Sequence, residues 1–222
     1  MQFPEEITFI AFDIDGTLFS AEEIILPVYE KAIQQFIDNT GKDLAVPSRS
    51  EIMSQVGKPV KTIFQNLMPG LEETERDSIS NSVLQLLCES IAGGGGHIYE
   101  GVKDTVAFLK QQGKKIVVAS NGRSPYIEAI LQVSGLSSFF EDLVVINNTS
   151  IMTKGDILRT YINKYKISAK NILMVGDRSS DEQAALDVGA PFIFCKYGHA
   201  PKGEVTRFDR EIEQITDLRH IR

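Results

Sequence analysis

Apolar residues follow two patterns along the chain, and each pattern predicts a different kind of element. Residues 8–12 form a short run of β-branched and aromatic side chains, which is typical of a buried strand. From about residue 21 to residue 92 the apolar residues recur at helical spacing, with almost no strand signal. Helices are expected to end near Gly41 and to begin near Ser48, Val60 and Glu72, the last running through Cys88.

Beyond residue 96 the patterns of strands and helices alternate. The expected strands cover residues 115–119, 143–146, 171–175 and 191–196, and the expected helices cover 102–112, 124 onward, 155–165 and 179–189. A short strand and one terminal helix are expected from residue 209. Strands separated by helices predict an α/β fold with a doubly wound, Rossmann-like parallel sheet. Residues 20–92 are then a helical insertion into a core formed by residues 1–19 and 93–222.

Some residues have the chemistry that begins, ends or interrupts a helix. Ser124, followed by proline, is typical of a helix start, and Ser179 with Glu182 three residues later predicts a capping box. Gly189 is expected to end that helix. The four glycines 93–96 predict a hinge or linker; a Walker-type phosphate loop is disfavoured because no Gly-Lys-Ser/Thr follows.

Composition and charge exclude several classes of protein. Hydrophobic residues make up 42% and charged residues 24% of the 222 residues, which is ordinary for a soluble globular protein. No apolar run approaches the roughly 18 residues of a membrane span, and the first residues, Met-Gln-Phe-Pro-Glu-Glu, lack a secretory pattern. The net charge of −7 disfavours nucleic acid as a partner. Cys88 and Cys195 are expected to be buried core thiols in a reducing cytoplasm, while His97, His199 and His220 show no ligand spacing.

Two acids follow the first predicted strand directly. Asp13 and Asp15 would share one face of a strand, and acids that close repel each other unless a cation lies between them or one is protonated. A solvated acidic turn is the alternative for Asp-x-Asp-Gly alone. The pair therefore predicts a metal site or an acid–base site.

Polar residues also follow the other predicted strands. The second strand leads into Ser120, Asn121 and Gly122, and Lys154 lies shortly after the third. The fourth ends in a segment that contains Asp177 and Asp181. Because the carboxyl ends of parallel strands meet at one edge of the sheet, these groups are expected to line one crevice.

This ordered set of motifs resembles the phosphatase branch of the haloacid dehalogenase superfamily, and in particular phosphoglycolate-phosphatase-like members. Asp13-Ile14-Asp15-Gly16-Thr17-Leu18 resembles the family's first motif, Ser120-Asn121 the second, Lys154 the third, and Gly176-Asp177 with Asp181 the fourth. The resemblance spans the whole chain, and the helical insertion has the position of the family's C1 cap. It implies Mg²⁺-dependent hydrolysis of a small phosphomonoester.

The resemblance also implies a role for each acid. Asp13 would be the nucleophile that forms an aspartyl-phosphate, and Asp15 would protonate the leaving oxygen and later deprotonate water. Mg²⁺ would be held by Asp13, the backbone carbonyl of Asp15, and Asp177, with waters completing the coordination. Asp181 would orient a metal-bound water.

The remaining motif residues are expected to bind the phosphoryl group or the substrate. Lys154 would neutralise the phosphate and Asp13 together, with Lys166 and Lys170 as substitutes were it misplaced. Ser120 and neighbouring backbone N–H groups would bind phosphoryl oxygens, with Asn121 and Gly122 shaping that loop. In the insertion, Val56-Gly57-Lys58-Pro59 resembles the cap's specificity loop, so Lys58 and Arg49 are candidates to meet an anionic leaving group.

The chain departs from the family pattern in two places, which leaves the subfamily open. Ser20-Ala21 stands where phosphoglycolate-phosphatase-like members and phosphosugar mutases carry an acid and a hydroxyl, and Lys154 is followed by glycine rather than proline. Tyr197-Gly198-His199 nevertheless resembles a loop of the phosphoglycolate group.

Three alternatives accompany the phosphatase hypothesis: a phosphosugar mutase, a pyrophosphatase on the same scaffold, and a phospho-acceptor signalling domain. A signalling receiver would carry its acceptor aspartate after the third strand, where this chain has Asn147-Asn148. No long heptad pattern predicts a coiled-coil dimer, so monomer and dimer both stay open.

Overall fold

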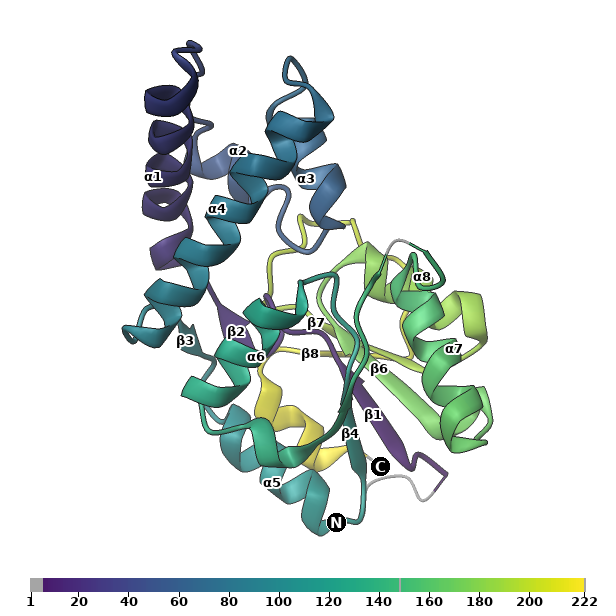
Figure 1. Ribbon diagram of the computed structural model, residues 1–222. Helices are drawn as coiled ribbons and strands as arrows, with labels where there is room; N and C mark the ends of the chain where they lie inside the picture. Colours follow the sequence, from purple (N-terminus) through teal and green to yellow (C-terminus); the bar gives the residue numbers. More distant parts are fainter. Residues whose placement is uncertain (1–5, 148, 222) are drawn as a thin grey trace.

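The protein contains a six-stranded parallel sheet, seen in a computed structural model that describes residues 6–147 and 149–221. The strand order is β5-β4-β1-β6-β7-β8 (Figure 1). The strands are β1 (Phe9–Phe12), β4 (Lys115–Val118), β5 (Phe140–Leu143), β6 (Ile172–Gly176), β7 (Phe192–Cys195) and β8 (Arg210–Ile212). This topology confirms the predicted doubly wound α/β fold. Two predictions fall partly outside the described residues: the secretory pattern was sought in residues 1–5, and Asn148 is one of the two asparagines at the receiver position.

Both faces of the sheet are covered because alternate residues of its central strand point to opposite sides. Ile10 and Phe12 pack in one apolar cluster with α5 (Val102–Gln111), α6 (Ser124–Val133) and the 3₁₀ helix η3 (Ile215–His220). Phe9 and Ala11 pack in a second cluster with α7 (Lys154–Tyr165) and α8 (Ser179–Val188). The sheet is therefore buried between two helical layers. The carboxyl ends of its strands are not covered by these layers, so the loops that follow them can form a site.

The third strand of the core is displaced from its predicted position. The sequence predicts residues 143–146, whereas β5 spans Phe140–Leu143. It is an edge strand, so the polar Glu141 and Asp142 are tolerated there. The apolar run that suggested a buried strand continues past the sheet, where the Val144 N–H donates to the Tyr161 hydroxyl over 2.9 Å.

The predictions for helix ends need three corrections. Arg178 and Asp181 form the capping box of α8, so Ser179 is its first residue and Ser179–Glu182 is not the box. Similarly, the N-cap of α6 is Arg123, not Ser124. The tail forms the predicted short strand β8, but the segment after it, η3, is a 3₁₀ helix rather than an α-helix. Gly189 ends α8 in the left-handed conformation, as predicted.

Four helices occupy the chain between β2 (Phe19–Ser20) and β3 (His97–Ile98), which pair antiparallel. We call this segment the helical insert; it contains α1 (Glu22–Thr40), α2 (Arg49–Met53), α3 (Val60–Leu67) and α4 (Glu73–Ala92). It has an apolar cluster of its own, centred on residues such as Ile33, Ile52 and Ile79. Figure 1 shows the insert standing over the end of the sheet where β1 and β6 finish.

The glycine run between α4 and β3 is partly packed rather than open. A Cβ on Gly95 would lie 2.7 Å from Ile24 Cγ2, and one on Gly96 would lie 2.3 Å from Phe19 Cζ. Gly94, in contrast, has no atom within 4 Å of that position. The run therefore lets the chain pass close to β2 and α1 as it returns to the core.

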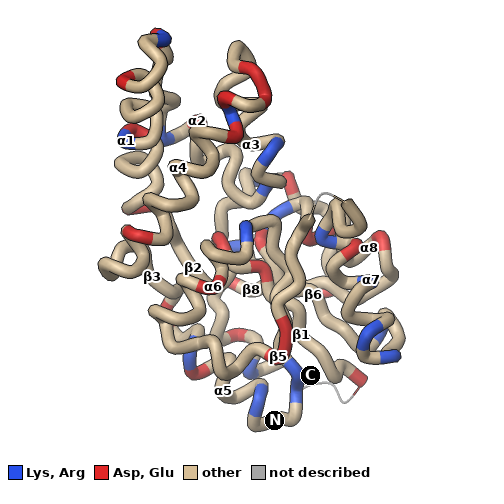
Figure 2. Tube along the Cα trace, viewed as in Figure 1, with Lys and Arg blue, Asp and Glu red and all other residues tan. Residues whose placement is uncertain are grey.

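The prediction that both cysteines are buried core thiols has a mixed outcome. Cys195 is buried as predicted, whereas Cys88 on α4 is only half-buried, so the prediction is wrong for Cys88. Lys and Arg are scattered among Asp and Glu on both the core and the insert (Figure 2). Among the described residues, no helix has the length and apolarity needed to cross a membrane.

Candidate active site

Four loops meet at the carboxyl edge of the sheet and bring the predicted polar residues together. Phe12 of β1 is in register with Val118 of β4 on one side and Val175 of β6 on the other. Asp13 therefore begins its loop beside the loops that carry Ser120 and Asp177. Lys154 enters the same space from the first residue of α7.

Three buried carboxylates and one ammonium form the centre of the site. Asp13, Asp177 and Asp181 are each at most 1% exposed, and one carboxylate oxygen from each lies within 4.8 Å of the others. The Lys154 ammonium lies 2.8 Å from Asp13 Oδ2 and 2.6 Å from Asp181 Oδ1. Lys166 ends α7 and Lys170 precedes β6, so both lie toward the opposite edge of the sheet.

The charges of this cluster do not balance. Burial, with the neighbouring carboxylates of Asp13 and Asp181, raises the pKa of Asp177 well above its ordinary value. Burial opposes the charge of Lys154, but Asp13 and Asp181 outweigh it and raise the lysine pKa. One ammonium among three carboxylates leaves an excess of negative charge, which a bound cation would neutralise.

The residues present fit a magnesium ion. Asp177 Oδ2 accepts a hydrogen bond from the His199 N–H over 2.6 Å, whereas its Oδ1 is buried without a hydrogen-bond partner among the described residues. Gly16 and Gly198 pack so closely on Asp177 that a Cβ on either would lie 2.2–2.3 Å from its side chain. An acidic cluster of hard oxygen donors with a free carboxylate oxygen is the chemistry that Mg²⁺ prefers.

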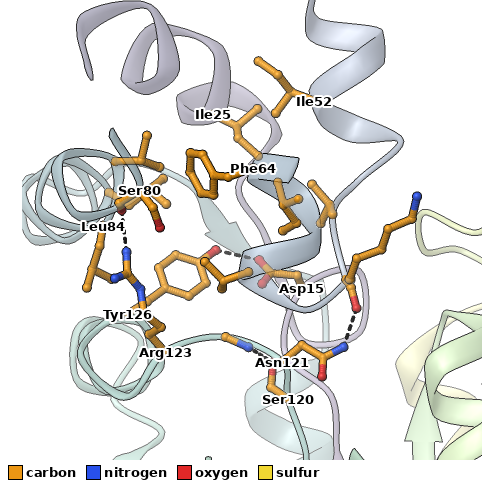
Figure 3. Close-up of a pocket in the computed structure, with 18 of the residues that line it drawn as sticks. Asp15, Ile25, Ile52, Phe64, Ser80, Leu84, Ser120, Asn121, Arg123 and Tyr126 are labelled. Atoms are coloured by element: carbon orange, nitrogen blue, oxygen red, sulfur yellow. Dashed lines mark hydrogen bonds between the residues drawn. The ribbon is translucent and has the colours of Figure 1, made fainter. Parts of the chain in front are cut away.

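Asp15 turns its side chain away from this cluster. The Tyr126 hydroxyl donates to Asp15 Oδ1 over 2.6 Å, as Figure 3 shows. Burial, with a contribution from nearby Asp13, raises the pKa of Asp15 to about 7, although the Tyr126 bond and Lys154 act in the opposite direction. A carboxyl with a pKa near neutrality can donate and accept a proton under physiological conditions. The predicted metal role of Asp15 concerns only its backbone carbonyl.

In the loop after β4, Ser120 lies in the site and Asn121 contacts the insert. Ser120 is 2% exposed and its hydroxyl accepts from the Gly122 N–H over 3.2 Å. The Asn121 amide instead donates to the backbone carbonyl of Gly57 over 2.7 Å (Figure 3). Asn121 therefore fastens the insert to the core.

The two cationic residues predicted in the insert have different positions. Lys58 lines the pocket, and its ammonium donates to Gln55 Oε1 over 3.0 Å. Arg49 does not line it: the guanidinium is half exposed and pairs with Glu22 at 3.2 Å. Arg49 begins α2 after the Ser48 cap, and this placement directs it to α1 rather than to the site.

Two arginines that were not predicted also join insert and core. Arg178 pairs with Glu204 at 2.8 Å and donates to the Val56 carbonyl. Arg123 donates to Asn81 Oδ1 over 2.7 Å and to the Ser80 carbonyl on α4. Both follow a predicted motif directly in the sequence, but nothing in a single sequence indicates which carbonyl an arginine will reach.

A pocket of about 100 Å³ lies between core and insert (Figure 3). Its core side includes Asp13, Asp15 and Ser120, and its other side is formed by the insert. The site can therefore hold a small molecule with one end against the carboxylates.

Comparison with known proteins agrees with this arrangement. A family model described as haloacid dehalogenase-like hydrolase matches residues 7–189. Phosphoglycolate phosphatase from Photobacterium profundum is 27% identical over 203 residues, covering 88% of this chain and 86% of its own. Pyrophosphatase PpaX from Listeria welshimeri is 23% identical over 180 residues, covering 81% and 78%.

Solved structures show the same fold. A protein from Haemophilus somnus described as a predicted phosphoglycolate phosphatase has a TM-score of 0.85 at 20% identity, with 97% of each chain covered. CbbY from Rhodobacter sphaeroides, solved in complex with phosphate, has a TM-score of 0.78 at 18% identity, covering 96% of each chain. The family model spans most of the sequence, and this chain belongs to the haloacid dehalogenase-like hydrolase family.

Proposed function

We propose that this hydrolase is a Mg²⁺-dependent phosphatase that cleaves a small phosphomonoester through an aspartyl-phosphate intermediate. The observation that carries the proposal is the buried cluster in which Lys154 contacts both Asp13 and Asp181 while Asp177 keeps one carboxylate oxygen free. Asp13 of this cluster lines the same pocket as Asp15. The names of the relatives, phosphoglycolate phosphatase and pyrophosphatase, support phosphoryl transfer as the reaction class.

In the proposed reaction Asp13 and Asp15 act in turn. A carboxylate oxygen of Asp13 attacks phosphorus, the bond from phosphorus to the ester oxygen breaks, and Asp15 gives its proton to the departing alkoxide. Asp15 then takes a proton from water as the water oxygen attacks the phosphoryl group and Asp13 is released. The pKa of Asp15, about 7, suits both transfers.

The surrounding residues hold the phosphoryl group and the carboxylates in place. Lys154 neutralises charge on Asp13 and on the transferring group, and Ser120 with the loop N–H groups binds phosphoryl oxygens. Asp13, Asp177 and the Asp15 carbonyl would hold Mg²⁺, with Asp181 beside them; the ion supplies charge neutralisation that lets an anion approach phosphate.

A phosphosugar mutase would share this first half-reaction but return the phosphoryl group to a sugar. Phosphate release separates the two, because a mutase interconverts isomers without it. The two unpaired cysteines suit a reducing compartment, so the proposal places the enzyme in the cytoplasm.

The test is phosphate release from a panel of small phosphomonoesters, with Mg²⁺ and then with a chelator. Asp13→Asn is expected to lower kcat by at least about 10³-fold while circular dichroism and Tm stay close to wild type. Asp43→Asn, at an exposed position of the insert, is the matched control and should keep full activity. Full activity in Asp13→Asn would overturn the proposed mechanism.

A further inference from the structure

The pocket has two chemically different sides. The core side carries Asp13, Asp15 and Ser120. The side formed by the insert includes Lys58 and Ser80, but most of its side chains are apolar. We call six of these the apolar roof: Ile25, Ile52, Val60, Ile63, Phe64 and Leu84. Figure 3 shows several of these side chains gathered above Asp15.

The cations that line the pocket are already engaged by protein groups. The Arg123 guanidinium donates to the Asn81 side chain and to the Ser80 carbonyl, and Figure 3 shows the bond to Ser80. The Lys58 ammonium donates to the Gln55 amide oxygen, which also accepts from Asn66 over 2.7 Å. Uncharged oxygen acceptors of the insert therefore hold both cations in place.

The roof is also firmly built. The Phe64 ring stacks on Tyr29, with centroids 5.7 Å apart and planes inclined by 6°. Phe64 and Ile52 are 4% and 1% exposed, so both are held by packing against the insert's own core. A rigid, preformed apolar wall favours an apolar ligand whose shape fills it.

We infer that the apolar roof is the binding site for the leaving group, and that this enzyme prefers phosphomonoesters of compact, uncharged, apolar alcohols. The inference rests on the proposed function, because it assigns the far side of the same pocket to the part of the substrate that departs. The pocket volume of about 100 Å³ suits a small leaving group.

The physical reason is the different effect of the roof on charged and apolar groups. A carboxylate placed against the aliphatic side chains of the roof loses hydration and gains no hydrogen bond from them, which weakens binding. Each methylene that enters the roof instead strengthens binding about fourfold, the equivalent of about 0.8 kcal/mol.

The experiment compares two esters that match in size and differ in charge. Isobutyl phosphate and 2-phosphoglycolate have the same number of heavy atoms, with an isopropyl group in one and a carboxylate in the other. We expect kcat/KM with Mg²⁺ to be at least about tenfold higher for isobutyl phosphate. A ratio near one, or a preference for 2-phosphoglycolate, would overturn the inference while leaving the proposed function intact.

Binding of non-hydrolysable analogues separates the two proposals. Calorimetric titration with 3-methylbutylphosphonate and 3-phosphonopropionate, another matched pair, is expected to give at least about tenfold tighter binding of the former. No hydrolysis of either ester, together with this binding preference, would overturn the proposed function and support the roof. If neither ester is hydrolysed and the two phosphonates bind equally, the proposed function and the assignment of the roof are both overturned.

A pair of isosteric variants locates the effect. Val60→Thr places a hydroxyl in the roof without changing its volume and is expected to lower the isobutyl preference about threefold to tenfold. Val46→Thr, at an insert residue that is 41% exposed and outside the pocket, should leave the ratio unchanged. Equal ratios in both variants and wild type would contradict the assignment of the roof.

Discussion

Asp13 and Asp15 are two residues apart, yet they have different partners. Asp13 faces the Lys154 ammonium at 2.8 Å, whereas Asp15 accepts a hydrogen bond from Tyr126 at 2.6 Å. The first environment places a cation beside the Asp13 carboxylate, and the second is a buried one in which the pKa of the Asp15 carboxyl is raised to about 7. Different environments for neighbouring acids are a general way of separating a nucleophile from an acid.

The first prediction concerns Tyr126, which we regard as a positioning residue for Asp15. Tyr126→Phe removes the hydroxyl that orients Asp15 Oδ1, so kcat for an alkyl phosphate should fall about tenfold with little change in KM. The loss should be smaller for 4-nitrophenyl phosphate, because its leaving group needs little protonation. Steady-state kinetics on both esters are the measurement.

The matched control for this prediction is Tyr165→Phe. Its hydroxyl contacts Asp142 at 3.3 Å, beside the edge strand and away from the pocket. The same loss for both esters, or in both variants, would show that Tyr126 acts on stability rather than on Asp15.

At the scale of elements, the loop between α2 and α3 determines how the insert meets the core. Its carbonyls at Val56 and Gly57 accept hydrogen bonds from Arg178 and Asn121. Gly57 has φ +88°, and a Cβ there would lie 2.8 Å from Arg178 Cγ. The glycine is needed both for the backbone conformation and for the close approach of the arginine.

The second prediction follows from this close approach. Gly57→Ala is expected to lower kcat/KM at least about tenfold, because the insert can no longer close fully over the pocket. Gly41→Ala is the control: Gly41 also has positive φ, at +68°, but no atom lies within 4 Å of the added carbon. Both variants should lose about 1 kcal/mol of stability, and only Gly57→Ala should lose activity.

At the scale of the whole molecule, the acidic cluster joins β1, β6, α7 and α8. The excess negative charge at this junction opposes folding in the absence of a cation. Binding of Mg²⁺ to the native state alone would stabilise the whole fold by mass action, by about 2.7 kcal/mol at 100 times the Kd.

The third prediction is therefore a rise in Tm with Mg²⁺, by about 2–4 °C for each kcal/mol gained. Asp177→Asn should abolish the rise, and Asp104→Asn, at an exposed position of α5, should preserve it. Differential scanning calorimetry with Mg²⁺ and with chelator is the measurement. An equal rise in Asp177→Asn would place the ion elsewhere.

Local chemistry along the chain was enough to predict most of the sheet and its motifs. Short apolar runs, helical periodicity and polar residues at strand ends are encoded within a few residues, and so were readable without tertiary contacts. The errors in element bounds arose where adjacent residues carried a similar local signal, so that the wrong residue was assigned to the strand or cap. The apolar run 143–146 continues past the edge strand β5, and Asp181 rather than Glu182 completes the cap of α8.

The tertiary structure alone determined which side chains oppose one another across long stretches of sequence. Tyr126 reaches Asp15, Arg178 reaches Val56, and Arg49 turns to Glu22 rather than to the pocket. The apolar roof likewise forms only when four helices of the insert pack and face the sheet. Local signals in the sequence therefore located the residues of the proposed reaction centre, most of which follow strands. Packing determined the surroundings of that centre, because they depend on contacts that no local pattern contains.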